Sequence, residues 1–141
     1  FKLYRFREYG ADETHIALVK GNPSCGIATV RVHALNPLKD LFGHINSKHS
    51  WDIRSALAEI GRSEQGVFVW IDPGHAVDIS GALDKFQANT SVHESGEPYR
   101  SIGVGAQILK QLGVKDMQLL SSSAKFNVSG FDLNIVKVIP R

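Results

Sequence analysis

Two histidines, His44 and His49, flank a short polar loop in the stretch LFGHINSKHSWDI, residues 41–53. Imidazole is the commonest side-chain ligand for zinc and related metals, so the pair could form half of a metal site. The two residues are five positions apart, which is not the i, i+4 spacing that places two ligands on one face of a helix. The spacing favours solvated loop histidines, with a site built from His33, His44 and His49 as the alternative.

The amino-acid composition excludes several kinds of site and partner. Cys25 is the single cysteine among 141 residues, which excludes an internal disulfide and a multi-cysteine zinc site and fits the cytoplasm. Lysine and arginine are scattered and the net charge is only +2, so we expect no nucleic-acid partner. No apolar run is long enough to span a bilayer, so we expect no membrane insertion. A small anionic ligand is compatible with this charge balance.

The elements that would position these residues are predicted from hydrophobic periodicity. Segments 15–21 and 27–35 are rich in β-branched residues and are separated by GNPSCG, which predicts an antiparallel hairpin. A helix is predicted from Ser50, as N-cap, to Gly61, with apolar residues at i, i+3, i+4 and i+7. These are Ile53, Ala56, Leu57 and Ile60. The apolar run 66–71 predicts a strand buried on both faces in the middle of the sheet.

Helices are also predicted over 77–87 and 102–114, and strands over 117–120 and 131–139. Gly103 and Gly105 would let the later helix lie close to a neighbour. Alternating strands and helices predict an α/β fold, a layered α/β/α arrangement with a mixed sheet and an N-terminal antiparallel hairpin. We expect a single domain over residues 1–141. The chain begins within a strand-like run at Phe1, which predicts a fragment of a longer protein.

Six segments, taken in order and spacing, resemble GTP cyclohydrolase II of riboflavin biosynthesis. The segments are HIALVKG, VRVHA, DLFG, GVFVWID, GAQILKQLGV and LLSSSAK, and the resemblance covers nearly the whole chain. The resemblance implies the fold of that family. In the family, three cysteines hold a zinc ion that generates the hydroxide attacking the nucleotide.

The zinc positions of the family fall on Asn36, Ser47 and His49 in this chain. Asparagine and serine are neutral, poor zinc ligands, and one histidine among three positions does not hold the ion with useful affinity. The resemblance therefore implies that zinc is absent and that no cofactor is expected. On this interpretation the histidines mark the place of a lost metal site.

The nucleotide contacts of the family are also incomplete. Arg31 and His33 keep the start of a nucleotide-contacting segment, whereas Ala34 and Leu35 replace its polar end. Asp72 stands where the family has a cation in a phosphate-facing loop, and a carboxylate there would repel a triphosphate.

Arg100 aligns with the arginine that the family is thought to use as a nucleophile toward phosphate. The acid that should accompany it is replaced by Pro98, with Glu97 as an adjacent substitute. Ser121 and Lys125 keep a hydroxyl and an amine that could hold a phosphate, and plain turn chemistry is the alternative. The residual ligand-binding set is thus Arg31, His33, Arg100, Ser121 and Lys125.

The favoured hypothesis is a GTP cyclohydrolase II-like domain that has kept the fold and lost the zinc-dependent reaction. The resemblance implies a structural, dimerising or regulatory part of a fusion with an upstream 3,4-dihydroxy-2-butanone 4-phosphate synthase domain, assembled as a homodimer. One alternative is a module that senses a nucleotide or phosphate. The other is an active cyclohydrolase with an altered site.

Overall fold

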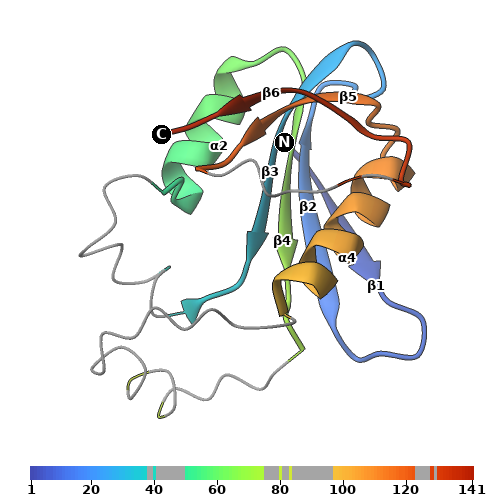
Figure 1. Ribbon diagram of the computed structural model, residues 1–141, viewed down its shortest axis with the longest axis vertical. Helices are drawn as coiled ribbons and strands as arrows, with labels where there is room; N and C mark the ends of the chain where they lie inside the picture. Colours follow the sequence, from blue (N-terminus) through green and yellow to red (C-terminus); the bar gives the residue numbers. More distant parts are fainter. Residues whose placement is uncertain are drawn as a thin grey trace.

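The computed structural model describes residues 1–37, 40, 50–74, 80, 83, 97–122, 128 and 130–141 (Figure 1). Within them, six strands form one mixed sheet in the order β1-β2-β4-β3-β5-β6. The strands are β1 (Lys2–Arg7), β2 (Thr14–Lys20), β3 (Ile27–Ala34), β4 (Gly66–Ile71), β5 (Asp116–Leu120) and β6 (Asn134–Ile139). The described residues include two longer helices, α2 (Ile53–Arg62) and α4 (Glu97–Gln111). No described helix is long and apolar enough to cross a membrane.

The N-terminal antiparallel hairpin is formed by β1 and β2, which pair with Leu3 opposite Leu18. The hairpin predicted between 15–21 and 27–35 is wrong, because β4 lies between these two segments. β4 pairs antiparallel with β2 and parallel with β3. Its side chains are almost wholly apolar, so the central position buries both of its faces and pairs both of its edges. The turn residues between β2 and β3 carry no signal that another strand, β4, separates these two strands in the sheet.

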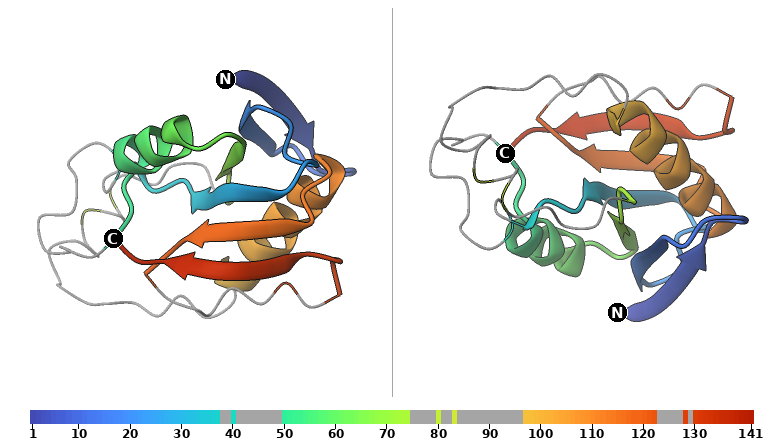
Figure 2. Two further views of the ribbon diagram at one scale, coloured as in Figure 1. Left: turned by 90° about the horizontal axis from the view of Figure 1, so that it is seen from above. Right: turned by 90° about the horizontal axis from the view of Figure 1, so that it is seen from below.

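The two helices cover opposite faces of the sheet, which confirms the predicted α/β/α layers (Figure 2). Alternate residues of β4 divide between the two cores because successive side chains of a strand point to opposite faces. Val67, Val69 and Ile71 pack with α4, whereas Phe68 and Trp70 belong to the core under α2. The strand predicted to be buried on both faces is therefore confirmed.

Helix α2 keeps the predicted apolar face but begins two residues later than predicted. Asp52, not Ser50, is the N-cap, because its carboxylate accepts a hydrogen bond from the Ser55 backbone N–H at 2.8 Å. At the other end, the Lys20 ammonium donates to the carbonyls of Gly61 and Ser63 at 2.5 and 2.7 Å. The positive charge of Lys20 interacts favourably with the partial negative charge at the C-terminus of α2. This interaction holds the end of β2 against the end of α2.

Substituting Asp52 is expected to show a pH-dependent loss of stability. Burial would raise the pKa of Asp52, but hydrogen bonds from Ser55 and the Arg141 guanidinium outweigh it and lower the pKa from its ordinary 3.8 to about 2. Its stabilising effect is thus present above about pH 4 and is lost as the pH falls toward 2. The side chain is 38% exposed, so solvent screening limits the effect to about 1 kcal/mol.

Urea denaturation of Asp52→Asn at several pH values measures this effect. The difference from the unsubstituted protein should be about 1 kcal/mol at pH 7 and vanish near pH 2. Asp132→Asn is the matched control, since Asp132 is 87% exposed in its ion pair with Lys110. A deficit of Asp52→Asn that stays constant from pH 7 to pH 2 would contradict the assignment.

Helix α4 starts five residues before the predicted helix and ends at Gln111. Gly113 follows in the left-handed conformation, φ +82°, and the Val114 N–H donates to the Leu109 carbonyl, which terminates the helix. The close approach predicted for its glycines is confirmed at Gly105, where an added Cβ would lie 2.7 Å from Val32 Cγ1. A Cβ added at Gly103 would meet no atom of the described residues within 4 Å.

Two of the remaining predicted elements lie among the described residues, and one lies mostly outside them. The predicted strand 117–120 is β5, which starts one residue earlier. The predicted strand 131–139 is β6, which starts at Asn134 because residues 130–132 form a turn, with Asp132 at φ +56°. The helix predicted over 77–87 lies outside the described residues apart from positions 80 and 83.

Candidate functional site

The carboxyl ends of the parallel strands β3, β4 and β5 form the edge where most of the predicted site residues lie. β2 runs in the opposite direction to β4, so its first residues reach the same edge. In open α/β sheets, ligands bind at this edge, because loops and helix N-termini converge there. His33, Arg100 and Ser121 are placed at this edge, and Arg31 lies one step inside it on β3.

Arg31 connects three parts of the chain through its guanidinium. Its Nη1 donates to the Leu120 carbonyl at 2.8 Å and its Nη2 to the Trp51 carbonyl at 3.2 Å. Burial lowers the pKa of Arg31, and the charge of Asp40 opposes that shift. Both terminal nitrogens are therefore engaged with the main chain, which ties β3 to the end of β5 and to the start of α2.

His33 lies within hydrogen-bond distance of Asp40, with its Nε2 2.9 Å from Oδ1. The other carboxylate oxygen of Asp40 accepts from the Asn36 backbone N–H at 3.1 Å. The His33 ring also stacks on Phe68, with ring centroids 6.1 Å apart. Asp40 thus orients the imidazole and closes the turn that follows β3.

Arg100 lies in the first turn of α4, and its Nη2 is 3.2 Å from both Glu8 Oε2 and Glu13 Oε1. These hydrogen bonds raise the pKa of Arg100. The pKa of Glu13 is lowered, chiefly because its carboxylate accepts a hydrogen bond from the Glu13 backbone N–H and also because it faces Arg100. Burial acts in the opposite direction. We call Glu8, Arg100 and Glu13 the Arg100 cluster.

The sheet separates the Arg100 cluster from Arg31 and His33. Along β3, Ala28 and Val30 pack in the core under α4, so Arg31 and His33 point to the face that carries α2. Arg100 belongs to α4 on the other face. The described hydrogen bonds do not join Arg31 or His33 to Arg100. The residues predicted as one ligand-binding set therefore form two groups.

The other predicted site positions are only partly described. The Ser121 backbone N–H donates to the Ile139 carbonyl at 3.1 Å, which continues the pairing of β5 and β6. Asn36 is described and exposed in the turn after β3. Lys125, Ser47, His44 and His49 lie outside the described residues, as does the side chain of Glu97. In the part of the chain that the structure describes, no group of three or more His, Cys, Asp or Glu side chains is arranged to hold a metal ion.

Three functional candidates were missed by sequence reasoning, namely Glu8, Glu13 and Asp40. The signal for the two glutamates was the acidic segment REYGADET between β1 and β2, whose ends must meet once the hairpin forms. No sequence signal linked them to Arg100, which is 87 or more positions away. Asp40 could have been found, since it begins the DLFG segment seven residues after His33.

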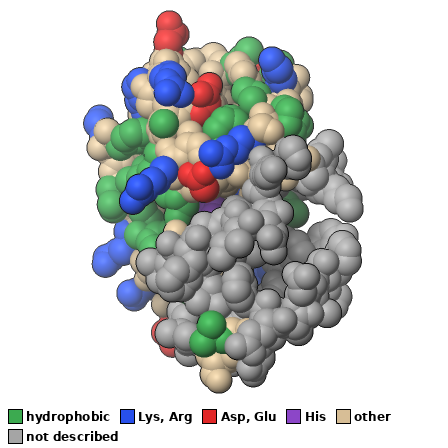
Figure 3. Space-filling view, turned by 90° about the vertical axis from the view of Figure 1, so that its left-hand side faces the viewer, with side chains coloured by type: hydrophobic (Ala, Val, Ile, Leu, Met, Phe, Trp, Pro, Cys, Tyr) green, Lys and Arg blue, Asp and Glu red, His purple; other side chains and the backbone are tan. Residues whose placement is uncertain are grey.

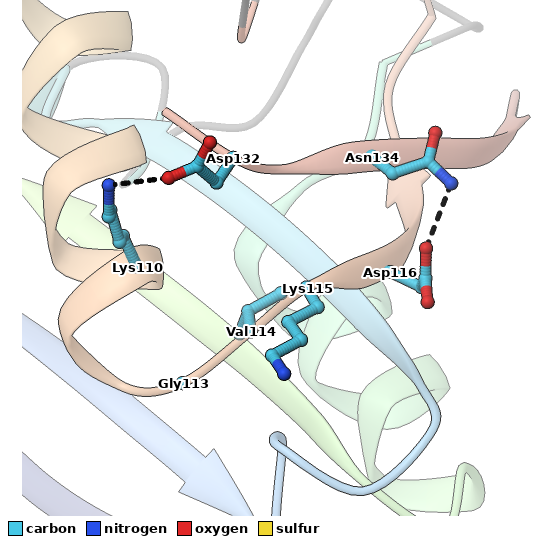
Figure 4. A pocket seen from close by; sticks show the side chains of 7 residues that line it. All are labelled: Lys110, Gly113, Val114, Lys115, Asp116, Asp132 and Asn134. Atoms are coloured by element: carbon cyan, nitrogen blue, oxygen red, sulfur yellow. Dashed lines mark hydrogen bonds and ion pairs between the residues drawn. The ribbon is translucent and has the colours of Figure 1, made fainter. Parts of the chain in front are cut away.

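A hollow of about 400 Å³ lies at the opposite edge of the sheet, where α4 ends and β5 and β6 begin (Figure 4). Four of its five polar side chains are paired with one another. Lys110 Nζ lies 2.9 Å from Asp132 Oδ2, and Asn134 Nδ2 donates to Asp116 Oδ1 at 2.8 Å. None of the predicted site residues lines this hollow.

The surface over α2 shows cations, carboxylates and apolar side chains interspersed rather than gathered by kind (Figure 3). Arg141 exemplifies the mixture, because it pairs with Asp52 and also donates to the Ser50 carbonyl at 3.1 Å. On the described part of this face, the charges do not form a continuous patch of one sign.

Comparison with known proteins gives consistent matches to riboflavin enzymes. A 3,4-dihydroxy-2-butanone 4-phosphate synthase from Pseudomonas aeruginosa is 32% identical over 99% of this chain and 39% of its own length. The protein of that name from Neisseria meningitidis serogroup A is 36% identical over 96% of this chain and 37% of its own. A riboflavin biosynthesis protein RibBA from Bacillus cereus is 31% identical over 89% of this chain and 35% of its own.

A solved structure agrees with these relatives. RibBX of A. baumannii, a two-domain 3,4-dihydroxy-2-butanone 4-phosphate synthase, superimposes with a TM-score of 0.62 at 37% identity, over 97% of this chain and 34% of that one. The chain thus spans between about a third and two fifths of the length of these proteins. The model of the GTP cyclohydrolase II family matches residues 1–140. This chain belongs to the GTP cyclohydrolase II family.

Proposed function

We propose that this chain is the GTP cyclohydrolase II-like part of a two-domain 3,4-dihydroxy-2-butanone 4-phosphate synthase that acts in riboflavin biosynthesis in the cytoplasm. It has lost zinc-dependent hydrolysis of GTP and serves as a structural, dimerising or regulatory unit for the synthase domain. The names and the greater lengths of its relatives support the assignment to a larger synthase.

The observation that carries the loss of chemistry is the engagement of both arginines by the protein itself. Arg31 donates to two backbone carbonyls, and Arg100 is paired with two carboxylates. A triphosphate needs such guanidinium groups for charge-assisted hydrogen bonds. In this protein a phosphate would have to displace the carbonyl groups that bind Arg31 or the carboxylates that pair with Arg100.

The donor set for zinc supports the same proposal. Asn36, Ser47 and His49 together offer one good zinc ligand, whereas a catalytic zinc needs three protein ligands. The Asn36 backbone takes part in the turn closed by Asp40, because its N–H donates to the Asp40 carboxylate and its carbonyl accepts from the Asp40 N–H. The residues present therefore do not fit the metal, and we assign no step to it.

Elemental analysis and a formate-release assay with GTP test the proposal. We expect less than about 0.1 zinc per chain and no formate above background, because the hydroxide-generating ion is missing. The protein at its full length should instead convert ribulose 5-phosphate to 3,4-dihydroxy-2-butanone 4-phosphate and formate, so the GTP assay contains no ribulose 5-phosphate. Stoichiometric zinc together with formate release from GTP would refute the loss of activity.

Thermal denaturation with GTP, GMP and FMN tests the sensing alternative in the same preparation. A ligand present at 100 times its Kd stabilises a fold by about 2.7 kcal/mol, so binding would be readily visible. We expect no shift with any of the three. Light scattering on the eluting protein checks the proposed homodimer.

A further inference from the structure

Arg100 occupies an electrostatically unusual position in α4. It is the fourth residue of a 15-residue helix, within the first turn. The backbone N–H groups of that turn lack helical acceptors and carry partial positive charge, so a cation there is unfavourable. An exposed arginine at this place would attract an anion from solution. In this protein the negative charge comes from the chain itself.

Glu8 and Glu13 supply that charge from the two ends of the β1–β2 connection. Glu8 follows β1, Glu13 precedes β2, and one oxygen of each lies 3.2 Å from the same nitrogen, Arg100 Nη2. Two oxygens converging on one guanidinium nitrogen resemble the arrangement that a multi-oxygen anion would offer. The Arg100 cluster carries a formal charge of −1, so it repels a further anion.

Glu13 is held in place more firmly than an ordinary surface carboxylate. Its side chain is only 15% exposed, compared with 41% for Glu8. Gly74, at φ +81°, lies directly beneath it, and a Cβ added there would be 2.0 Å from Glu13 Oε1. The loop after β4 therefore packs directly against the Glu13 carboxylate. This close packing limits how far the carboxylate can move away from Arg100.

We propose that Glu8 and Glu13 are specificity-determining residues that act as built-in anionic ligands of Arg100 and exclude phosphate-bearing molecules from the N-terminus of α4. The inference rests on the proposed function, in which the domain has no phosphate chemistry to perform. The inference goes beyond that function in one respect. Arg100 and the first turn of α4 can still bind a phosphate group, but the carboxylates of Glu8 and Glu13 block that binding. Neutralising them should restore it.

The test measures binding of inorganic phosphate and pyrophosphate by titration calorimetry, using the protein at its full length. Glu8→Gln/Glu13→Gln keeps the shape of both side chains and removes both charges. We expect this variant to bind pyrophosphate about tenfold more tightly than the unsubstituted protein, because Arg100 and the helix dipole are then uncompensated. Adding Arg100→Gln should abolish the gain, which separates this site from any phosphate site elsewhere.

Glu59→Gln/Glu64→Gln is the matched control, with the same change in net charge. Glu59 pairs with Arg62 at 3.2 Å, so this control also releases an arginine, but at the C-terminal end of α2. Because the dipole there favours the cation, we expect no gain in pyrophosphate binding. The single variant Glu8→Gln, at the more exposed carboxylate, should give a gain of about threefold if the double variant folds poorly.

The proposal is overturned if Glu8→Gln/Glu13→Gln and Glu8→Gln both bind pyrophosphate no better than the unsubstituted protein. It is also overturned if the control gains equally, or if the gain survives Arg100→Gln. These outcomes are distinct from failure of the proposed function, which shows as stoichiometric zinc and release of formate from GTP in the unsubstituted protein. An active cyclohydrolase with a blocked Arg100 would still pass the present test.

Discussion

Arg31→Ala is expected to lower the free energy of unfolding by about 3 kcal/mol. The substitution leaves the Leu120 and Trp51 carbonyls without their charged donor and creates a cavity between β3 and α2. It also removes the cost of burying a cation, which keeps the loss from being larger. Urea denaturation followed by far-ultraviolet circular dichroism measures the change.

Two further variants show whether the bridging geometry matters. Arg31→Lys keeps the charge, but an ammonium cannot reach both carbonyls in the planar arrangement of a guanidinium, so about half of the loss should remain. Arg5→Ala, on exposed strand β1, removes an arginine with no side-chain partner among the described residues and should cost less than about 0.5 kcal/mol. Equal stability of Arg31→Ala and Arg5→Ala would refute the structural role.

Gly105→Ala is expected to lower the free energy of unfolding by about 2 kcal/mol. The added Cβ would lie 2.7 Å from Val32 Cγ1, so α4 must move away from β3 or Val32 must change rotamer. Val32 lies between Arg31 and His33 along β3, and α4 carries Arg100, so this contact sets the spacing of both halves of the site. Thermal and urea denaturation both measure the effect.

Gly103→Ala is the control in the same helix and should act in the opposite direction. Among the described residues, no atom lies within 4 Å of a Cβ added at Gly103, so the substitution should stabilise the protein by about 0.5–1 kcal/mol through helix propensity. Combining Gly105→Ala with Val32→Ala should recover part of the loss as a favourable coupling. A stabilising effect of Gly105→Ala would show that α4 is not held against Val32.

The position of β4 shows why only part of the fold was predictable. Its apolar run identified a strand buried on both faces, since that property depends on local composition. The strand that pairs with each edge is a non-local matter. The GNPSCG turn between β2 and β3 favoured a hairpin, but pairing with β4 on both sides buries more apolar surface.

Helix α2 also has one feature that the local sequence predicts and one that depends on a tertiary contact. The apolar spacing of α2 correctly predicted the face that Ala56 and Ile60 bury. The choice between Ser50 and Asp52 as N-cap depended on which side chain could also pair with Arg141, at the other end of the chain. Local propensity permits both residues at this position, and the tertiary contact selects one.

By itself the sequence determined the fold class and the family, and the resemblance to that family places asparagine and serine at two of its three zinc positions. The fold class follows from periodicity along the chain, whereas the family and the zinc positions follow from the resemblance of the six segments. Only the tertiary structure decided what the retained arginines do. Arg31 is held by carbonyls 20 and 89 residues away, and Arg100 by glutamates 92 and 87 residues away. A charged side chain takes its role from the groups that folding brings to it, and those distances along the chain carry no local signal.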